Sequence, residues 1–188
     1  MSRGIVFIDR DGVINKFPGH GEYVLSKEAL EVFPYVIESL KSLKEKGFLI
    51  YIISNQACVA KGLISEDHLK EMTKDMLSRI EAEGKLIDGV HYCIHSQEED
   101  CPYRKPNAGM IQEVFKQAGL DAASARSQSY FIGDSIRDVQ AAQAAELKSI
   151  LVLSGKETIE QRDSWEARPD FIFNNLKDAV DFILRFVP

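Results

Sequence analysis

Apolar residues along the chain follow two different patterns. Short continuous apolar runs are typical of strands buried on both faces of a parallel sheet, and apolar residues spaced three or four apart are typical of helices. The runs predict strands at residues 5–8, 48–54, 91–94, 130–133, 149–153 and 171–173. The wider spacing predicts helices that carry the stripe from Val32 to Leu43 and end near Gly47, and over 65–80, 107–117 and 175–186. This alternation predicts an α/β fold, with a central parallel sheet and helices on both faces.

Nothing in the sequence divides the chain. It has no repeat, low-complexity tract or linker, so we expect one domain over residues 1–188. Residues 57–90 are accounted for by one helix and its loops, which leaves no insert of the size of a second, capping domain. We therefore expect an open site, with selectivity supplied by the loops at 17–25 and 95–103.

Composition narrows the function classes. The 188 residues are 45% hydrophobic and 28% charged, which is ordinary for a globular protein. A net charge of −6 argues against general nucleic-acid binding, and no apolar run of about 18 residues predicts a membrane span. The first three residues lead directly into an apolar strand, and three cysteines cannot all pair with one another. We expect a cytoplasmic protein that is monomeric, because no exposed apolar stripe is evident.

The first predicted strand ends in two carboxylates. Asp9 and Asp11 are spaced two apart, so in extended chain they face the same side, and Gly12 permits a sharp turn directly after them. Ligands of open α/β sheets bind at the carboxyl ends of the strands. Two close carboxylates indicate a divalent cation or opposite protonation states, whereas the structural alternative is a strand end followed by an Asp-Gly turn.

Three later segments carry polar groups at comparable places. Ser54 and Asn55 end the second strand, Arg104 and Lys105 precede Pro106, and Asp134 ends the strand at 130–133 with Asp138 one helical turn further on. Each has a simpler interpretation, respectively a turn, a solvated cation pair and a helix cap. The ordered set of all four segments is far more specific than any one of them.

These residues resemble the haloacid dehalogenase-like (HAD) superfamily of phosphohydrolases, over roughly residues 4–155. The segments 9–15, 54–56, 104–106 and 133–135 are similar to those of the small histidinol-phosphatase and heptose-bisphosphate phosphatase group. Gly109-Met110, Tyr23-Val24 and the segment 153–156 favour the heptose-bisphosphate branch. The resemblance implies a Rossmann-like HAD fold and Mg²⁺-dependent removal of a phosphate from a small metabolite.

The resemblance also implies the catalytic roles. Asp9 would be the nucleophile that forms an aspartyl-phosphate, and Asp11 would protonate the leaving alkoxide and then act as base on water. For the first of these steps Asp11 must be protonated. Ser54 would donate a hydrogen bond to the transferring group, and Lys105 would neutralise its developing charge.

The same resemblance implies ligand and substrate contacts. Asp9, the backbone carbonyl of Asp11, and Asp134 would hold Mg²⁺, with Asp138 supporting them. Arg104 and Asn55 are the candidates for substrate contact, since a guanidinium suits recognition of paired oxygens.

A cysteine-bearing loop is a candidate zinc site with one ligand missing. Cys93, His95 and Cys101 have metal-ligand spacing, and in the resembled group a fourth cysteine stands where this chain has Tyr103. Tyrosine is a poor ligand because its hydroxyl has a pKa of about 10. A water, Glu99 or Asp100 could complete the site. The alternative is a loop held by packing alone, with free thiols.

A second departure from the group lies beside the expected site, where Ala57-Cys58 replaces Ser-Gly and Lys61 replaces Arg. Cys58 is interpreted as a small apolar filler. The leading hypothesis is removal of the C7 phosphate of D-glycero-D-manno-heptose 1,7-bisphosphate. A histidinol-phosphate phosphatase and a catalytically silent binding protein are the alternatives, and no Gly-x-Gly-x-x-Gly follows a strand to favour dinucleotide binding.

Overall fold

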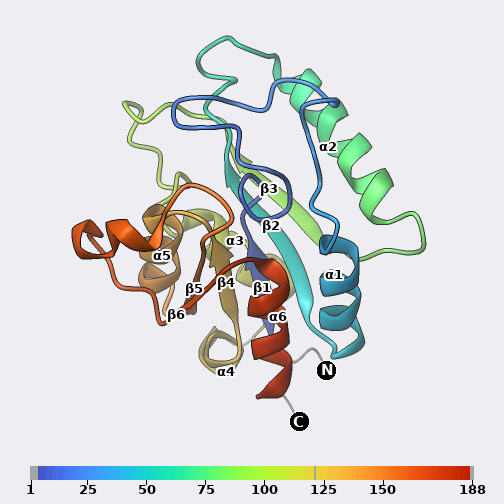
Figure 1. Ribbon diagram of the computed structural model, residues 1–188, viewed down its shortest axis with the longest axis vertical. Coiled ribbons are helices and arrows are strands. Elements are labelled where there is room, and N and C mark those ends of the chain that lie inside the picture. Colours follow the sequence, from blue (N-terminus) through green and yellow to red (C-terminus); the bar gives the residue numbers. More distant parts are fainter. Residues whose placement is uncertain (1–3, 121, 187–188) are drawn as a thin grey trace.

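One parallel sheet forms the centre of the molecule. The computed structural model describes residues 4–120 and 122–186, and its six strands lie in the order β3-β2-β1-β4-β5-β6 (Figure 1). The strands are β1 (Ile5–Ile8), β2 (Leu49–Asn55), β3 (Gly89–Cys93), β4 (Tyr130–Gly133), β5 (Lys148–Val152) and β6 (Phe171–Phe173). All neighbouring pairs are parallel. The predicted α/β fold with a central parallel sheet is confirmed.

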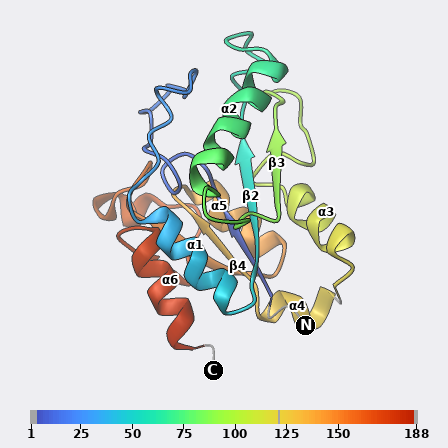
Figure 2. The same cartoon turned by 90° about the vertical axis from the view of Figure 1, so that its right-hand side faces the viewer.

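Helices cover both faces of this sheet. The helices are α1 (Val36–Glu45), α2 (Glu66–Ile80), α3 (Gly109–Ala118), α4 (Ala122–Ser127), α5 (Ile136–Ala144) and α6 (Leu176–Arg185), with a short 3₁₀ helix η1 (Ile159–Ser164). Helices α1, α2 and α6 pack on one face, and α3, α4 and α5 on the other (Figure 2). Between β2 and β3 the chain forms only α2 and its loops, so no capping domain is inserted there.

Strand β1 shows how the sequence specifies the two layers. Side chains of a strand alternate between faces. Val6 and Ile8 pack into the core beneath α1 and α6, whereas Ile5 and Phe7 pack into the core beneath α3 and α5. All four are fully buried, which explains why this strand reads as a continuous apolar run rather than an alternating one.

Most predicted elements are confirmed, with shifted ends. The strands at 5–8, 130–133 and 171–173 have the predicted bounds, and the other three are displaced by one or two residues. The stripe from Val32 is not all helix, because α1 begins only at Val36. Phe33 precedes Pro34, which disfavours helical backbone at Phe33, and Val32 instead bridges Asn15 in extended chain. Helix α4 and η1 were not predicted.

The topology reverses direction at the centre of the sheet. From β1 the chain proceeds outward through β2 and β3, and then returns to place β4 on the other side of β1. Such a switch point leaves a crevice beyond the carboxyl ends of the two central strands. Asp9 follows β1 and Asp134 follows β4, so the fold brings these two carboxylates together. In the part of the chain that the structure describes, no helix is both long and apolar enough to cross a membrane.

Candidate active site

A cavity of about 220 Å³ lies beyond the carboxyl ends of β1, β2 and β4. Its floor is formed by Asp9 and Asp11 after β1, Ser54 at the end of β2, Lys105, and Asp134 after β4. The sequence-predicted residues of all four segments therefore meet in one place. Asn55 and Arg104 also line the cavity, as does the loop that contains Phe17 and Tyr23.

Lys105 is a fully enclosed cation. Its Nζ lies 2.9 Å from Asp9 Oδ2 and 2.6 Å from Asp138 Oδ1, and it donates to the Ile53 carbonyl at 2.9 Å. Burial by itself lowers the pKa of this ammonium, but Asp138 and Asp9 raise it above its usual value. Lys105 is therefore charged at neutral pH, and its ammonium lies directly against the expected nucleophile.

Asn55 and Asp138 hold Lys105 in place. The Asn55 amide donates to the Lys105 carbonyl at 2.9 Å and accepts from the Lys105 backbone N–H at 3.1 Å. Asp138 Oδ2 accepts from both the backbone N–H and the hydroxyl of Ser135, which forms the capping box of α5. Asn55 was predicted to contact the substrate, but both polar atoms of its side-chain amide bond to the backbone of Lys105. Asp138, which we predicted to support the metal ligands, forms an ion pair with the same lysine.

Three carboxylates crowd around this one ammonium. Asp9, Asp134 and Asp138 are all buried, and one oxygen of each lies within 4.8 Å of the others. Burial raises the pKa of Asp9 to about 6, with Asp138 adding to the rise and Lys105 opposing it. Burial, Asp9 and Asp138 raise the pKa of Asp134 well above its usual value. The cluster has more negative charge than Lys105 can balance, and its carboxylate oxygens fit a hard divalent cation such as Mg²⁺.

Two glycines make room for Asp134. A Cβ on Gly12 would lie 2.1 Å from Asp134 Oδ2, and one on Gly155 would lie 2.0 Å from the same oxygen. The Lys156 backbone N–H donates to that oxygen at 2.7 Å, and the Ser154 hydroxyl donates to the Gly12 carbonyl. The loop after β5 therefore closes over the acidic cluster, which no local sequence pattern predicted.

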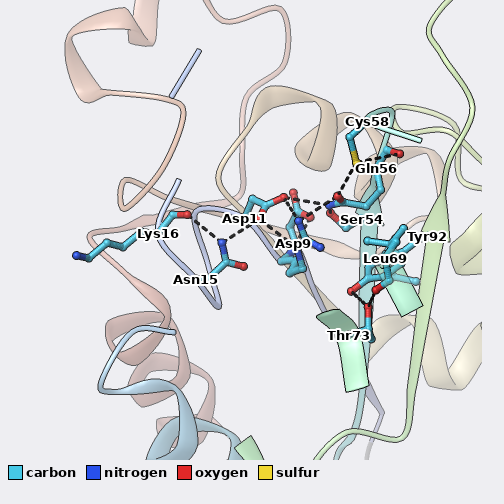
Figure 3. Close-up of polar contacts among 12 residues, drawn as sticks. Asp9, Asp11, Asn15, Lys16, Ser54, Gln56, Cys58, Leu69, Thr73 and Tyr92 are labelled. Carbon is cyan, nitrogen blue, oxygen red and sulfur yellow. Dashed lines mark hydrogen bonds and ion pairs between the residues drawn. The ribbon is translucent and has the colours of Figure 1, made fainter. Parts of the chain in front are cut away.

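Asp11 lies in a different electrostatic environment (Figure 3). The Arg10 guanidinium donates to both of its oxygens at 3.1 and 2.9 Å, and the amides of Asn15 and Gln56 donate at 2.9 and 3.0 Å. Burial acts to raise the pKa of Asp11, but Arg10 and these hydrogen bonds lower it below its ordinary value. In the free protein Asp11 is therefore ionised, and its predicted acid form must be acquired with the substrate.

Arg10 and Gln56 contact the predicted site residues, although the sequence analysis gave neither of them a role. Arg10 is completely buried, and its Nη2 also donates to Gln56 Oε1 at 3.0 Å. The Gln56 amide donates in turn to the Ser54 hydroxyl at 3.1 Å, so one network connects Asp11 to Ser54. One sequence signal pointed to Arg10: it stands between two aspartates directly after a buried strand, so its guanidinium could be expected to pair with a neighbouring carboxylate.

The cysteine loop brings its three predicted ligands together. His95 Nδ1 lies 3.1 Å from Cys101 Sγ and 3.8 Å from Cys93 Sγ. Among the residues described, this cluster contains no fourth Cys, His, Asp or Glu. Tyr103 is 46% exposed, and Glu99 accepts from the Ser96 backbone N–H at 2.6 Å.

The same loop meets the cavity through Arg104. The Arg104 Nη1 donates to the His95 carbonyl at 2.9 Å, and its backbone N–H donates to the Cys101 carbonyl. These hydrogen bonds connect the cysteine loop to the Arg104–Lys105 pair. Cys58 is fully buried, and burial raises the pKa of its thiol, consistent with an apolar filler.

Comparisons with known proteins agree with this geometry. A family model described as HAD-hydrolase-like matches residues 102–179. The D-glycero-beta-D-manno-heptose-1,7-bisphosphate 7-phosphatase of Haemophilus ducreyi is 35% identical, over 97% of this chain and 100% of its own length. The enzyme of the same name from Haemophilus influenzae is 31% identical over 96% of each chain. A crystal structure of D,D-heptose 1,7-bisphosphate phosphatase from B. bronchiseptica, complexed with magnesium and phosphate, superimposes with a TM-score of 0.85 at 23% identity, covering 97% of this chain and 98% of that one.

The raised carboxyl pKa values predict that Mg²⁺ stabilises the protein more at higher pH. In the metal-free protein the folded state binds the Asp9 proton more tightly than the unfolded state does. The stability from this group is therefore present below pH 4 and lost as pH rises through about 6. Mg²⁺ requires the ionised form, so its increment in Tm should be larger at about pH 7.5 than at about pH 5. Differential scanning fluorimetry with and without MgCl₂, at matched ionic strength, measures this, and equal increments at both pH values would contradict it.

The packing of Gly12 predicts a second outcome. Gly12 and Gly47 have almost the same backbone φ, +83° and +82°, but nothing lies within 4 Å of a Cβ at Gly47. Alanine at either position carries the same left-handed strain of about 1–2 kcal/mol, and only Gly12→Ala also collides with Asp134. Calorimetric titration should show Mg²⁺ affinity at least about tenfold weaker in Gly12→Ala and unchanged in Gly47→Ala. Equal affinities in the two variants would show that Asp134 does not bind the cation.

Proposed function

The chain belongs to the family of D-glycero-beta-D-manno-heptose-1,7-bisphosphate 7-phosphatases, and from this premise we propose that it removes the C7 phosphate of that sugar bisphosphate. The observation that carries the proposal is the convergence of Asp9, Asp11, Lys105 and Asp134 in one cavity at the switch point of the sheet. The names of the relatives favour the β anomer as substrate.

Asp9 is the proposed nucleophile. One of its carboxylate oxygens attacks the phosphorus, the bond from phosphorus to the C7 oxygen breaks, and an aspartyl-phosphate forms. Asp9 is supported on both sides, because the Arg10 backbone N–H donates to Oδ1 at 2.7 Å and Lys105 lies against Oδ2. These contacts hold the carboxylate in a fixed orientation at the floor of the cavity.

Asp11 is the proposed acid and base. It gives a proton to the departing C7 oxygen, and the resulting carboxylate then removes a proton from the water that attacks the aspartyl-phosphate. Arg10 keeps Asp11 ionised in the free protein. The charge of an incoming phosphate dianion opposes that effect and favours the protonated form, so the acid is generated when substrate binds.

The remaining side chains orient the phosphate. The Ser54 hydroxyl donates to a phosphate oxygen, Lys105 neutralises charge that develops on the transferring group, and Arg104 contacts the substrate. Asn55 contributes by fixing the backbone of Lys105. Asp9, Asp134 and the backbone carbonyl of Asp11 would hold Mg²⁺, with Asp138 supporting them. When bound, Mg²⁺ offsets the repulsion between these carboxylates and the phosphate.

We also propose a zinc ion in the loop formed by Cys93, His95 and Cys101. Two sulfur atoms and an imidazole nitrogen already converge there, which is a donor set that zinc prefers. Because the Glu99 carboxylate is engaged by Ser96, a water or Asp100 is the better candidate for the fourth ligand. Zinc would fix the loop that carries Arg104.

The composition of the chain and its single sheet also suggest the domain organisation, compartment and partners of the enzyme. We propose that residues 1–188 act as one catalytic domain, as a monomer in the cytoplasm, on a small phosphorylated metabolite, with no nucleic-acid or membrane partner. Support comes from the single sheet and from three free cysteines at positions 58, 93 and 101, which suit a reducing compartment.

Phosphate release with Mg²⁺ should identify the substrate. Among both anomers of heptose 1,7-bisphosphate, fructose 1,6-bisphosphate and histidinol phosphate, we expect the β-heptose bisphosphate to be cleaved best, with kcat/KM of about 10⁴ M⁻¹s⁻¹ or higher. Faster cleavage of histidinol phosphate would reassign the enzyme, and no cleavage of any phosphate ester would indicate a silent binding protein.

Metal analysis should show close to one zinc per chain when the protein is purified without chelators. Cys101→Ser should lose the zinc because it removes one of only three converging ligands, whereas Cys58→Ser should retain it. Less than about a tenth of an equivalent in the unmodified protein would show that the loop is held by packing alone.

A further inference from the structure

A second, larger cavity adjoins the one that contains Asp9. It has a volume of about 670 Å³, against about 220 Å³ for the first. Arg104, Lys105, Arg137 and Lys156 line both of them. The two cavities are therefore neighbouring lobes that share a wall rich in cationic side chains.

The smaller lobe cannot enclose a whole sugar bisphosphate. Pockets for small metabolites usually measure about 300–1,000 Å³, and the lobe at Asp9 lies below that range. With the reacting phosphate at Asp9, the rest of the substrate must extend either along the loop 17–23 or across the shared wall into the larger lobe.

Charge distinguishes these two directions. On the side of the loop 17–23, the smaller lobe is lined by Phe17, Pro18, His20, Gly21, Glu22 and Tyr23, of which only Glu22 has a formal charge at pH 7. The shared wall presents Arg104, Arg137 and Lys156. Within the described residues none of these three lies within 4.0 Å of a carboxylate oxygen, although acidic residues also line the larger lobe. A second phosphate is attracted to that wall and repelled by Glu22.

Arg137 is placed at a cost to its own helix. It is the second residue of α5, where a cation opposes the dipole of the helix. The Gln97 side chain accepts from its Nη2 at 2.9 Å, which holds the guanidinium toward the shared wall. Helix stability does not account for an arginine at this position, whereas recognition of an anion does.

We propose that Arg137, together with Lys156, binds the phosphate of the substrate that is not cleaved. The sugar then extends from the smaller lobe, which contains Asp9, toward the larger one. This inference rests on the proposed function and assigns the recognition of a bisphosphate to a residue of α5. Arg137 is a specificity-determining residue, and it takes no part in the transfer of the C7 phosphate.

The test compares a bisphosphate with a monophosphate in two charge-matched variants. Arg137→Gln removes a charge-assisted contact, so kcat/KM for the heptose bisphosphate should fall about 10- to 100-fold, mainly through KM. Turnover of an aryl phosphate, which has no second phosphate, should fall less than about threefold. Lys61→Gln removes the same charge from a lysine that stacks on Tyr23 and lines neither lobe, and it should leave the preference for the bisphosphate intact.

The outcomes separate this inference from the function on which it rests. If the unmodified enzyme prefers the heptose bisphosphate but Arg137→Gln weakens both substrates equally, the assignment of Arg137 is wrong and the function stands. If the unmodified enzyme shows no preference for a bisphosphate, both fail. Inhibition by a sugar 1-phosphate supplies a binding readout, since its inhibition constant should rise in Arg137→Gln and not in Lys61→Gln.

Discussion

The ion pairs of Lys105 are the interaction on which the rest of the site depends. A buried ammonium is costly unless it is paired, and here it is held between Asp9 and Asp138 and against the Ile53 carbonyl. The position of Asp138 is fixed because its carboxylate also caps α5 through Ser135. The position of Lys105 is fixed because the Asn55 amide hydrogen-bonds to its backbone. Strands β1 and β2, the loop before α3 and the start of α5 are thus coupled through one charge.

The single positive charge of Lys105 does not balance the three carboxylates around it. Asp9, Asp134 and Asp138 lie together with a single ammonium, and burial raises the pKa of Asp9 and of Asp134, which opposes their ionisation. A divalent cation bound here would relieve this repulsion, and the combined positive charge would then favour a phosphate. In the same cavity, Arg10 gives Asp11 the opposite environment, in which ionisation is favoured. Two carboxylates two residues apart thus have pKa values shifted in opposite directions by their surroundings.

The sequence predicted those parts of the site that a short segment of chain specifies by itself. Continuous apolar runs located the strands, and the fixed position of Asp9 and Asp134 at strand ends follows from the geometry of a parallel sheet. The contacts of Asn55 and Asp138 with Lys105 could not be predicted, because Lys105 is 50 and 33 residues away from them along the chain and meets them only in the fold. The contacts of Gly155 with Asp134 and of Arg10 with Gln56 were not predicted for the same reason, because these partners also meet only in the fold.

Trapping the phosphorylated enzyme would show whether Asp9 carries the phosphoryl group. A heptose bisphosphate radiolabelled in its C7 phosphate would be mixed with the Mg²⁺-loaded enzyme and quenched in acid within the first turnover. The protein would then be digested and its labelled peptides mapped. We expect label on the peptide that contains Asp9, released by alkaline hydroxylamine, and no label in Asp9→Asn. Label on another residue, or full turnover with no covalent label and with Asp9→Asn still active, would contradict it.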